Sequence, residues 1–382
     1  MKQYLLLIMV FFLASSSYAQ ITEDKSLTYN PDGFVATEKT TLSNLDDVTR
    51  YYQYPKDYGL PAVYSCGTIP TPTQGLIQLI AANNIDVPVE TYSVLHKYGT
   101  STTEVTEGVL TTFQANGYPY QVYKIESAIP IATFTPSHYD ATTCGLDMDL
   151  HYALQETYTK YDNYGNLLEK NTRGNKNISF IYSYKGAYKI AEVDNAANNQ
   201  IAYTSFETTD GGGWNYTPSG VLSLSSGSLI AGKNVYIIDY GAISNLNALP
   251  LGDYVVSFWR KAYTTPPPIP IVRLLLTGSS PTDNAVIGAT INGWTYEEHH
   301  IKNITGLTIS GNGDYIDELR LYPANAEMIT YGYTPLVGVT YSCDVASHFN
   351  YYEYDDLNRP TIVRDQNGNI KKKIDYRVQQ AE

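Results

Sequence analysis

The chain has 382 residues, which is enough for two or three domains at roughly 100–200 residues each. Only 16% of the residues are charged, and the net charge is −13, so we expect no nucleic acid and no anionic lipid among its partners. Tyrosine occurs 37 times. Its apolar ring and polar tip suit half-buried strands and contacts with carbohydrate.

Residues 1–19 have the features of a signal peptide. Lys2 supplies the positive charge, an apolar run extends from Leu5 to Ala14, and small residues before Gln20 form a cleavage site. The run is too short to span a bilayer, and no later segment approaches the roughly 18 apolar residues of a membrane helix. We therefore expect a mature chain that is secreted or held at the cell surface, with no membrane span.

Residues 20–197 are predicted to form short strands separated by turns. Polar and apolar residues alternate over three stretches, 90–98, 108–126 and 150–170. The pairs Asn116-Gly117 and Gly165-Asn166 are typical of hairpin turns. Residues 73–85 instead have helical spacing of their apolar side chains, which predicts one short helix.

The three cysteines, Cys66, Cys144 and Cys343, are far apart and include no CxxC pair. In an oxidising compartment Cys66 and Cys144 can pair, which would leave Cys343 free. The sequence does not decide between this pairing and three free thiols, because the geometry of the pair is unknown.

Residues 198–326 differ in composition, with more glycine and serine and all three tryptophans. Strand-sized runs occur at 234–240, 252–263, 271–278 and 315–323. They predict an antiparallel β-sandwich. Pro266–Pro268 lies between two of these runs, and we expect a loop there because proline cannot donate to a strand ladder.

The tyrosine-rich pattern resumes over residues 327–382. Its clearest unit is 352–369, in which Tyr352 and Tyr354 alternate along a predicted strand, so both rings lie on one face. Asp355 follows and can accept hydrogen bonds from turn amides, and the unit ends in an Asn-Gly turn. Such units are typical of arrays in which each one covers its neighbour.

This unit resembles the YD repeat of the RHS family. The matching residues are Tyr352, Tyr354, Asp355, Asn358, Arg359, Asp365, Gly368 and Asn369, and a looser copy has Tyr161, Asp162, Gly165 and Asn166. Asn358 stands where the family has glycine, and asparagine also enters the left-handed region. The resemblance implies a secreted protein of Bacteroidetes type, built of strands that in the family spiral into a shell around a toxin. Few units are visible here and no payload domain follows, so a truncated shell fragment of a toxin-delivery protein is one alternative.

Residues 198–326 are similar to the galactose-binding-like jelly rolls of carbohydrate-binding modules. The matching pieces are 205–216, 249–262, 293–303 and 313–323. The resemblance implies a structural Ca²⁺ held by Glu207 and Asp317, since carboxylates are ligands that this ion prefers. The other interpretation, in which both residues cap strands in water, stays open.

Two tryptophans are candidates for stacking on a sugar ring. Trp214 follows a triple glycine and Trp294 follows Asn292-Gly293, so both can be exposed in loops. Trp259 lies in an apolar strand and is predicted to be part of the core.

Catalytic residues are not predicted anywhere in the sequence. The chain has no GxSxG, HExxH or phosphate-loop motif. In the segment Glu297-Glu298-His299-His300, strand geometry allows only Glu297 with His299 and Glu298 with His300 to act together, and two ligands make a poor metal site.

These observations predict a mostly β fold, in which an array of YD-repeat β-hairpins is interrupted by an antiparallel jelly-roll sandwich. We expect a non-catalytic exported scaffold whose sandwich binds glycans or cell-surface proteins. A polysaccharide-degrading enzyme is the alternative from another class, since paired carboxylates cannot be located from sequence.

Overall fold

The computed structural model describes residues 24–225, 229–263 and 271–376. The predicted signal peptide and the Pro266–Pro268 loop lie outside these residues. The protein is mostly β with large antiparallel sheets, which confirms the predicted fold class. The chain divides into two compact units, Met1–Leu154 and Gln155–Glu382.

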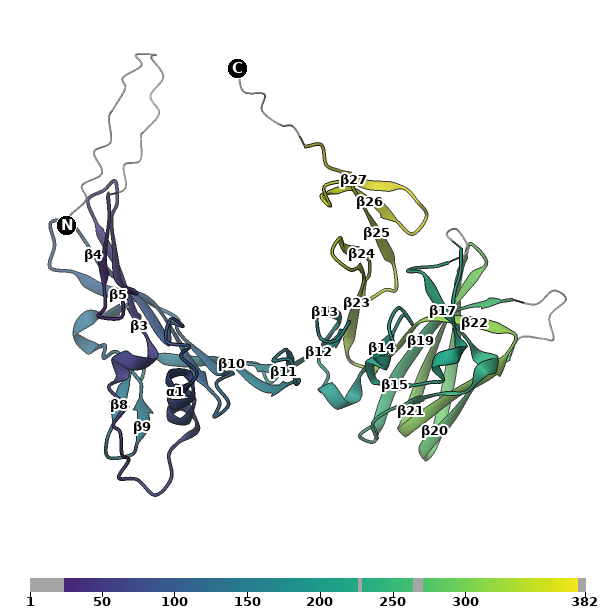
Figure 1. Cartoon of the computed structure of the whole chain (residues 1–382), viewed down its shortest axis with the longest axis horizontal. Helices are drawn as coiled ribbons and strands as arrows, with labels where there is room; N and C mark the ends of the chain where they lie inside the picture. Colours follow the sequence, from purple (N-terminus) through teal and green to yellow (C-terminus); the bar gives the residue numbers. More distant parts are fainter. Residues whose placement is uncertain (1–23, 226–228, 264–270, 377–382) are drawn as a thin grey trace, which may run out of the picture. The chain divides into compact units, whose positions relative to one another are not determined.

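The first unit is an antiparallel sheet with one helix packed on it (Figure 1). Its strands pair in chain order: β1 (Asp24–Tyr29), β2 (Val35–Thr41), β3 (Asp47–Gln53), β4 (Glu90–His96), β5 (Thr103–Phe113) and β6 (Pro119–Ile125). The remaining strands are β7 (Ile129–Pro130), which pairs with β5, and the hairpin of β8 (His138–Asp140) and β9 (Gly145–Asp147). Short 3-10 helices lie at Pro55–Tyr58 and Ile131–Thr133.

Helix α1 (Thr71–Ala81) confirms the predicted helix. Leu76 and Leu79 are buried in the core of this unit, against Phe113 of β5. Gly75 allows the close approach, because a Cβ there would lie 2.3 Å from the carbonyl oxygen of Phe113. The helix is thus fixed to the sheet by its apolar face.

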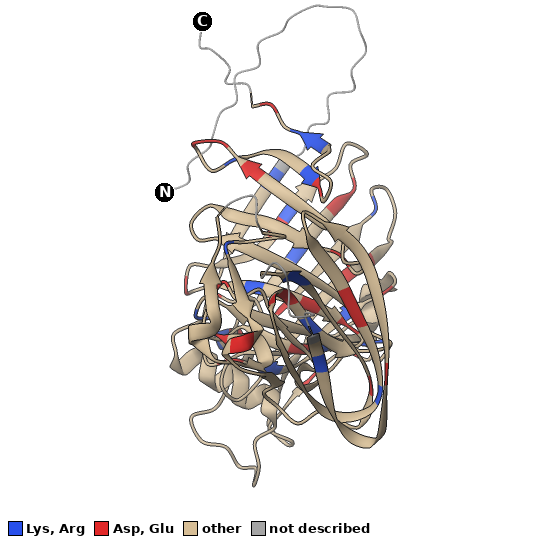
Figure 2. Cartoon of the chain, turned by 90° about the vertical axis from the view of Figure 1, so that its right-hand side faces the viewer, with Lys and Arg blue, Asp and Glu red and all other residues tan. Residues whose placement is uncertain are grey.

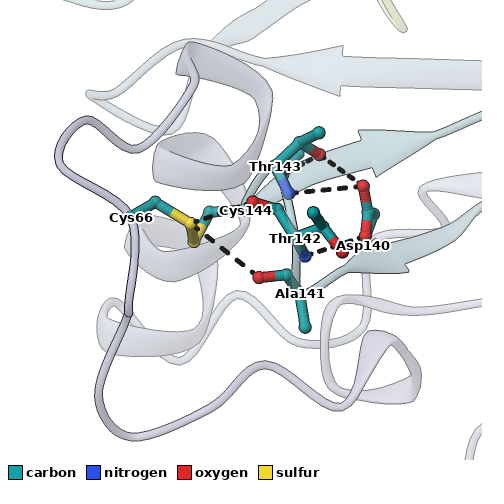
Figure 3. Close-up of a disulfide and its surroundings, with 7 residues drawn as sticks. Cys66, Asp140, Ala141, Thr142, Thr143 and Cys144 are labelled. Carbon is teal, nitrogen blue, oxygen red and sulfur yellow. Dashed lines mark hydrogen bonds between the residues drawn. A yellow bond between two sulfur atoms is a disulfide. The ribbon is translucent and has the colours of Figure 1, made fainter.

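A disulfide joins Cys66 to Cys144, with a Cα–Cα distance of 6.1 Å (Figure 3). Cys144 is buried in the turn between β8 and β9, where Asp140 accepts hydrogen bonds from the backbone of Thr142 and Thr143. The bond ties this hairpin to the segment before α1. It settles the pairing that the sequence left open, and Cys343 is free and buried.

The second unit contains what we call the tyrosine-rich sheet. Its strands pair in the following order: β10 (Tyr152–Tyr161), β11 (Leu167–Thr172), β12 (Asn177–Ser183), β13 (Tyr188–Asp194), β23 (Glu327–Thr334), β24 (Gly338–Cys343), β25 (Phe349–Tyr354), β26 (Pro360–Asp365) and β27 (Ile370–Lys373). β13 pairs directly with β23, Ala191 opposite Thr330 and Val193 opposite Met328. The intervening residues 198–326, which we call the inserted module, therefore leave the sheet and return to its neighbouring strand.

One type of turn recurs in the tyrosine-rich sheet, at Asp162, Asp344, Asp355 and Asp365. Asp355 shows the pattern: its Oδ1 accepts from the backbone N–H groups of Leu357 and Arg359 at 3.0 and 2.9 Å. The third residue after each aspartate has a positive φ: Gly165, Ser347, Asn358 and Gly368. These turns are three-residue hairpin loops that need a left-handed residue at their third position. This explains why Gly or Asn stands three residues after Asp in the repeat pattern of the sequence.

The inserted module is a curled antiparallel sheet (Figure 1). Its strands are β14 (Ala202–Thr204), β15 (Trp214–Asn215), β16 (Val221–Ser223), β17 (Asn234–Ile237), β18 (Ile243–Asn245), β19 (Gly252–Ala262), β20 (Ile271–Ile291), β21 (Trp294–Asn312) and β22 (Asp314–Pro323). 3-10 turns lie at Asn198–Gln200, Gly211–Gly213, Pro218–Gly220 and Ile238–Tyr240. β21 pairs with β19 along its first half and with β18 at Ile309. This one long strand therefore joins the part of the sheet around β19 to the part around β18. Between these two parts of the sheet lies an apolar core that includes Val256, Phe258 and Leu307.

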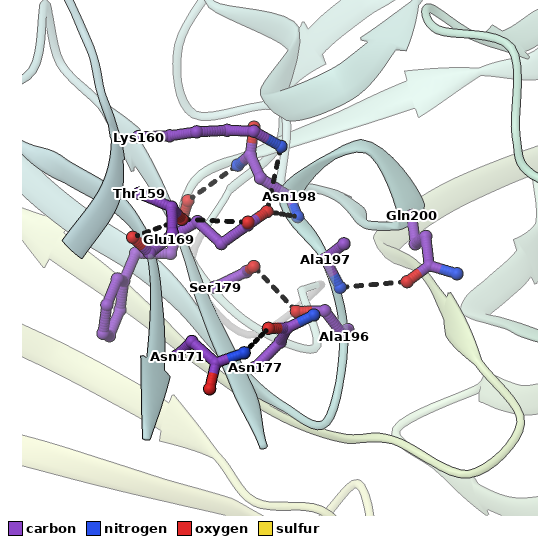
Figure 4. A network of polar contacts seen from close by, with 11 residues as sticks. Thr159, Lys160, Glu169, Asn171, Asn177, Ser179, Ala196, Ala197, Asn198 and Gln200 are labelled. Carbon is purple, nitrogen blue, oxygen red and sulfur yellow. Dashed lines mark hydrogen bonds and ion pairs between the residues drawn. The ribbon is translucent and has the colours of Figure 1, made fainter. Parts of the chain in front are cut away.

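Polar contacts hold the chain where it leaves the sheet for the inserted module (Figure 4). Glu169 of β11 accepts from the backbone N–H of Asn198 at 2.7 Å and from the ammonium of Lys160 at 3.0 Å. The Ser179 hydroxyl donates to the carbonyl oxygen of Ala196 at 2.8 Å. Because the exit segment is hydrogen-bonded to two strands, the start of the module has a defined position on the sheet.

Charged residues are sparse and mixed in sign along the strands (Figure 2). Lys371, Lys372 and Lys373 of β27 are exposed. No helix within the described ranges combines the length and the apolar character that crossing a membrane requires.

Candidate binding cleft beside Glu207

A cleft of about 330 Å³ lies where the inserted module meets the tyrosine-rich sheet. One side is the loop Leu229–Lys233 of the module, and the other consists of side chains from β23, β24 and β25. The lining side chains that carry hydroxyl or carboxylate groups are Glu207, Tyr333, Thr334, Thr340, Tyr341 and Tyr351. The cleft thus combines aromatic rings with hydrogen-bonding groups, and neither the module nor the sheet forms it alone.

Tyr351 attaches the loop of the module to the sheet. Its hydroxyl donates to the carbonyl oxygen of Ile230 at 2.6 Å, and its ring stacks on Phe349 with 5.7 Å between centroids. Ile230, Phe349 and Tyr341 belong to one buried cluster. Alternation along β25 places the rings of Phe349 and Tyr351 on the same face, as the aromatic-x-aromatic pattern of this strand requires.

Tyr333 of β23 belongs to a group of three tyrosines with Tyr188 of β13 and Tyr184 of the turn before β13. Its ring stacks on Tyr188 at 4.7 Å, and its hydroxyl donates to the carbonyl oxygen of Lys189 at 2.8 Å. Tyr184 packs edge-on against Tyr188 and donates to the carbonyl oxygen of Tyr333. Burial, together with the neighbouring tyrosines, raises the pKa of Tyr333 to about 12, so this phenol stays protonated at neutral pH.

Glu207, one of the two predicted metal ligands, lines the cleft. Its Oε1 accepts from the backbone N–H groups of Lys233 and Asn234 at 2.6 and 2.8 Å. Burial raises its pKa, and these two hydrogen bonds only partly offset that effect. The carboxyl group therefore positions the loop and lines the cleft as a hydrogen-bond acceptor.

Asp317, the other predicted ligand, is buried on β22, only 1% exposed. Its Oδ1 accepts from the backbone N–H of Glu318, whereas Oδ2 has no hydrogen-bond partner among the described residues. Burial raises its pKa well above the usual value, and the charges of Glu318 and Glu207 raise it further. The two predicted residues thus interact electrostatically, but within the described ranges no three His, Cys, Asp or Glu side chains are arranged to hold a metal ion.

Sequence reasoning missed a buried polar network around Glu318. This carboxylate accepts from the hydroxyls of Tyr203 at 3.0 Å and Tyr341 at 2.7 Å. Arg320, two residues along β22, donates to the Thr330 hydroxyl at 2.7 Å, which links the module to β23. Glu318 has a φ of 53° at a break in the strand register, so it does not follow the alternation that sequence reasoning assumes.

The two tryptophans predicted to contact sugar are buried, so the expectation that they are exposed is wrong. Trp214 is 3% exposed and its indole N–H donates to the carbonyl oxygen of Leu319 at 3.2 Å. Trp294 is 0% exposed and packs near Tyr315. The glycines before each tryptophan let the ring turn inward, so neither face is open to a ligand. Trp259 is buried, as predicted.

The Glu297–His300 segment pairs as strand geometry predicted. The Nε2 atom of His299 lies 3.2 Å from Oε1 of Glu297, and that of His300 lies 2.8 Å from Oε1 of Glu298. The first pair is buried and the second is partly exposed.

No protein-family model matches the sequence, and no curated protein matches it. Among solved structures, the chain is similar to a chain of the Tc holotoxin pore of Photorhabdus luminescens, with 9% sequence identity and a TM-score of 0.14. The match covers 92% of this chain and 27% of that chain. A similarity this low carries no argument about fold or function.

Proposed function

We propose that this protein is a non-catalytic exported scaffold of the RHS/YD-repeat type, and that it binds a glycan in the cleft beside Glu207. The observation that carries the proposal is the pairing of β13 with β23 across the inserted module. Because the module interrupts the sheet without ending it, a binding surface is presented on a continuous framework. Repeated aspartate turns and stacked tyrosines serve packing and have no evident role in bond breaking.

The chemistry of the cleft favours a saccharide. Tyrosine rings offer flat apolar faces, and Thr334 and Thr340 offer hydroxyls that can both donate and accept. Glu207 can accept from sugar hydroxyls with the oxygen that the loop does not use. A cell-surface protein presenting a tyrosine or amide side chain is the other partner that these groups could accept.

The binding test uses the whole mature chain, because the module and the sheet share one buried network. Titration calorimetry against a panel of plant and bacterial polysaccharides should give binding that Glu207→Gln weakens about tenfold or more, the cost of a lost hydrogen bond to a charged group. Thr340→Val should weaken it by about twofold to tenfold, as expected for a neutral hydrogen bond. Tyr98→Leu is the matched control, since Tyr98 is 65% exposed in the other unit. Binding that is insensitive to the cleft variants, or absent for every polysaccharide, would contradict the glycan proposal.

The same protein tests the non-catalytic part. Incubation with each bound polysaccharide should release no reducing sugar above the level of a heat-denatured control. Release that a single Asp or Glu substitution abolishes would establish the enzyme alternative instead.

We also propose a structural Ca²⁺ beside Glu207 and Asp317. The unpaired buried Oδ2 of Asp317 and the raised pKa of both carboxylates fit a site that lacks a positive charge. Glu207 and Asp317 would supply carboxylate oxygens, and backbone carbonyls could complete the set. The ion would neutralise the repulsion between the carboxylates of Glu207 and Asp317, and it would take no part in catalysis.

A further inference from the structure

The long edge strand β20 has two halves with different anchoring. Val272, Leu274 and Leu276 pack against the apolar core of the inserted module. After a register shift between Gly278 and Thr282, each of residues 282–290 is exposed. β20 pairs only with β21 in the described part of the chain. We call residues 282–290 the distal half of β20; just beyond it, Ile291 packs against the buried cluster that contains Trp294.

A buried side chain of β21 reaches this distal half. His299 of β21 is 5% exposed, and its Nδ1 lies 2.8 Å from Oδ2 of Asp283. Its Nε2 lies 3.2 Å from Oε1 of Glu297, and its ring stacks on Phe258 with 5.8 Å between centroids. The ring therefore sits between two carboxylates, one on β20 and one on its own strand.

The contacts continue across the curled sheet. Arg260 of β19 makes an ion pair with Glu297, Nε to Oε2 at 2.5 Å, although its angles fall outside hydrogen-bond geometry. Nη1 of Arg260 lies 3.2 Å from Oδ2 of Asp314 on β22. Asp283, His299, Glu297, Arg260 and Asp314 thus alternate in sign across four strands when the imidazole is protonated. The charged groups facing His299 are Asp283 and Glu297, with Arg260 and Asp314 beyond them.

The protonated form suits this environment. An imidazole contacts two carboxylates favourably only when both nitrogens carry hydrogen. Burial lowers the pKa of His299, but the hydrogen bonds and charges of Glu297 and Asp283 outweigh burial and raise it above the usual value of 6.5. The imidazolium is therefore the species that bridges β20 and β21 at and below that usual value.

We propose that His299 is a pH-operated latch, whose imidazolium fastens the distal half of β20 to β21 and whose deprotonation releases it. A neutral imidazole keeps one N–H, so one of the two carboxylates then faces a lone pair. In the distal half, a further side-chain hydrogen bond to β21 joins the hydroxyls of Thr290 and Thr295 at 3.0 Å, next to the hairpin turn. The backbone ladder remains, so release means frequent opening of the segment, not unfolding of the module.

The direction of the pH effect on the latch follows from the raised pKa of His299 in the folded protein. Since folding raises the pKa of His299, the latch contributes fully below about pH 6.5, and its contribution is lost as the pH rises through the folded value. Opening would expose the backbone edge of β21 opposite residues 282–287, a surface on which another strand can pair.

Hydrogen exchange of the whole mature chain, followed by mass spectrometry and corrected for intrinsic rates, tests the latch. Between about pH 6 and about pH 8.5, peptides covering 282–290 should lose on the order of tenfold in protection, the range expected for a charge-assisted hydrogen bond. Peptides covering 271–278 should not change. An equal response of both halves, or no response in either, overturns the proposal.

Variants separate the latch from general loosening of the module. Asp283→Asn, at an exposed position, should give the distal half its high-pH exchange rate already at about pH 6 and remove the pH dependence. His300→Gln is the matched control, because His300 is the neighbouring residue on the opposite face, paired with Glu298. If Asp283→Asn leaves the pH dependence intact, or His300→Gln removes it, His299 is not the latch.

Discussion

The hydroxyl of Tyr341 on β24 donates to Oε1 of Glu318 on β22 at 2.7 Å, where the inserted module meets the tyrosine-rich sheet. Both side chains are at most 2% exposed. Burial raises the pKa of Glu318, while the charge of Arg320 and the hydroxyls of Tyr341 and Tyr203 oppose that effect. A buried carboxylate of this kind is stable only while its partners remain, so removing one partner should destabilise the junction.

Tyr341→Phe should therefore destabilise the protein by about 1.5–3 kcal/mol, the cost of removing a hydrogen bond to a charged group. Chemical denaturation with urea measures the change. Tyr354→Phe is the control, since its hydroxyl donates to the neutral carbonyl oxygen of Val339 at 2.8 Å and should cost about 1 kcal/mol or less. Equal losses for the two variants would show that the carboxylate adds nothing.

Asp317→Asn should have opposite effects with and without calcium. Folding raises the pKa of Asp317, so its ionised form is unfavourable at neutral pH and the penalty disappears as the pH falls below the unfolded value near 3.9. With chelator at neutral pH, the variant should be more stable than the wild type by about 1–3 kcal/mol, and this difference should shrink on acidification.

With excess Ca²⁺, only the wild type should gain in melting temperature, and Glu207→Gln should lose part of that gain. Thermal scans of the mature chain with chelator and with calcium measure both arms. No shift of the wild type with Ca²⁺ would rule out the ion, and the charge effect of Asp317 would still be seen with chelator.

Cys343 should not react with thiol reagents in the folded protein. Its side chain is 1% exposed, and burial raises the pKa of the thiol to about 12, so hardly any thiolate forms at neutral pH. A colorimetric thiol assay should find none of the three cysteines in the native protein, one after denaturation, and all after denaturation with reductant. A native thiol signal would mean that β24 opens or that the Cys66–Cys144 bond is absent.

Asn358 should accept glycine but not a β-branched residue. Its φ is 56°, a conformation in which a branched Cβ meets the backbone. Asn358→Val should cost about 1–2 kcal/mol, whereas Asn358→Gly should stay within about 0.5 kcal/mol of the wild type. Denaturation midpoints measure both, with Leu357→Val as the control at an exposed neighbour. A similar cost for valine at both positions would show that the turn does not require the left-handed conformation.

Much of the local structure could be predicted from the sequence. Alternation, turn pairs and helical spacing located β4, β5, β6, β10, β11 and α1, because these signals depend on neighbours along the chain. The pairs Glu297 with His299 and Glu298 with His300 followed from the two-residue period of a strand. The inward position of Trp214 and Trp294 could not be predicted, because loops near glycine can turn either way.

By itself, the sequence determined a mostly β chain with repeated aspartate turns, since each turn is fixed by five consecutive residues. Only the tertiary structure decided that β13 pairs with β23, that Cys66 joins Cys144, and that Glu318 lies buried beside Tyr341. These contacts join segments separated by tens to more than a hundred residues. Their partners are selected by packing in space, and no pattern along the chain records that selection.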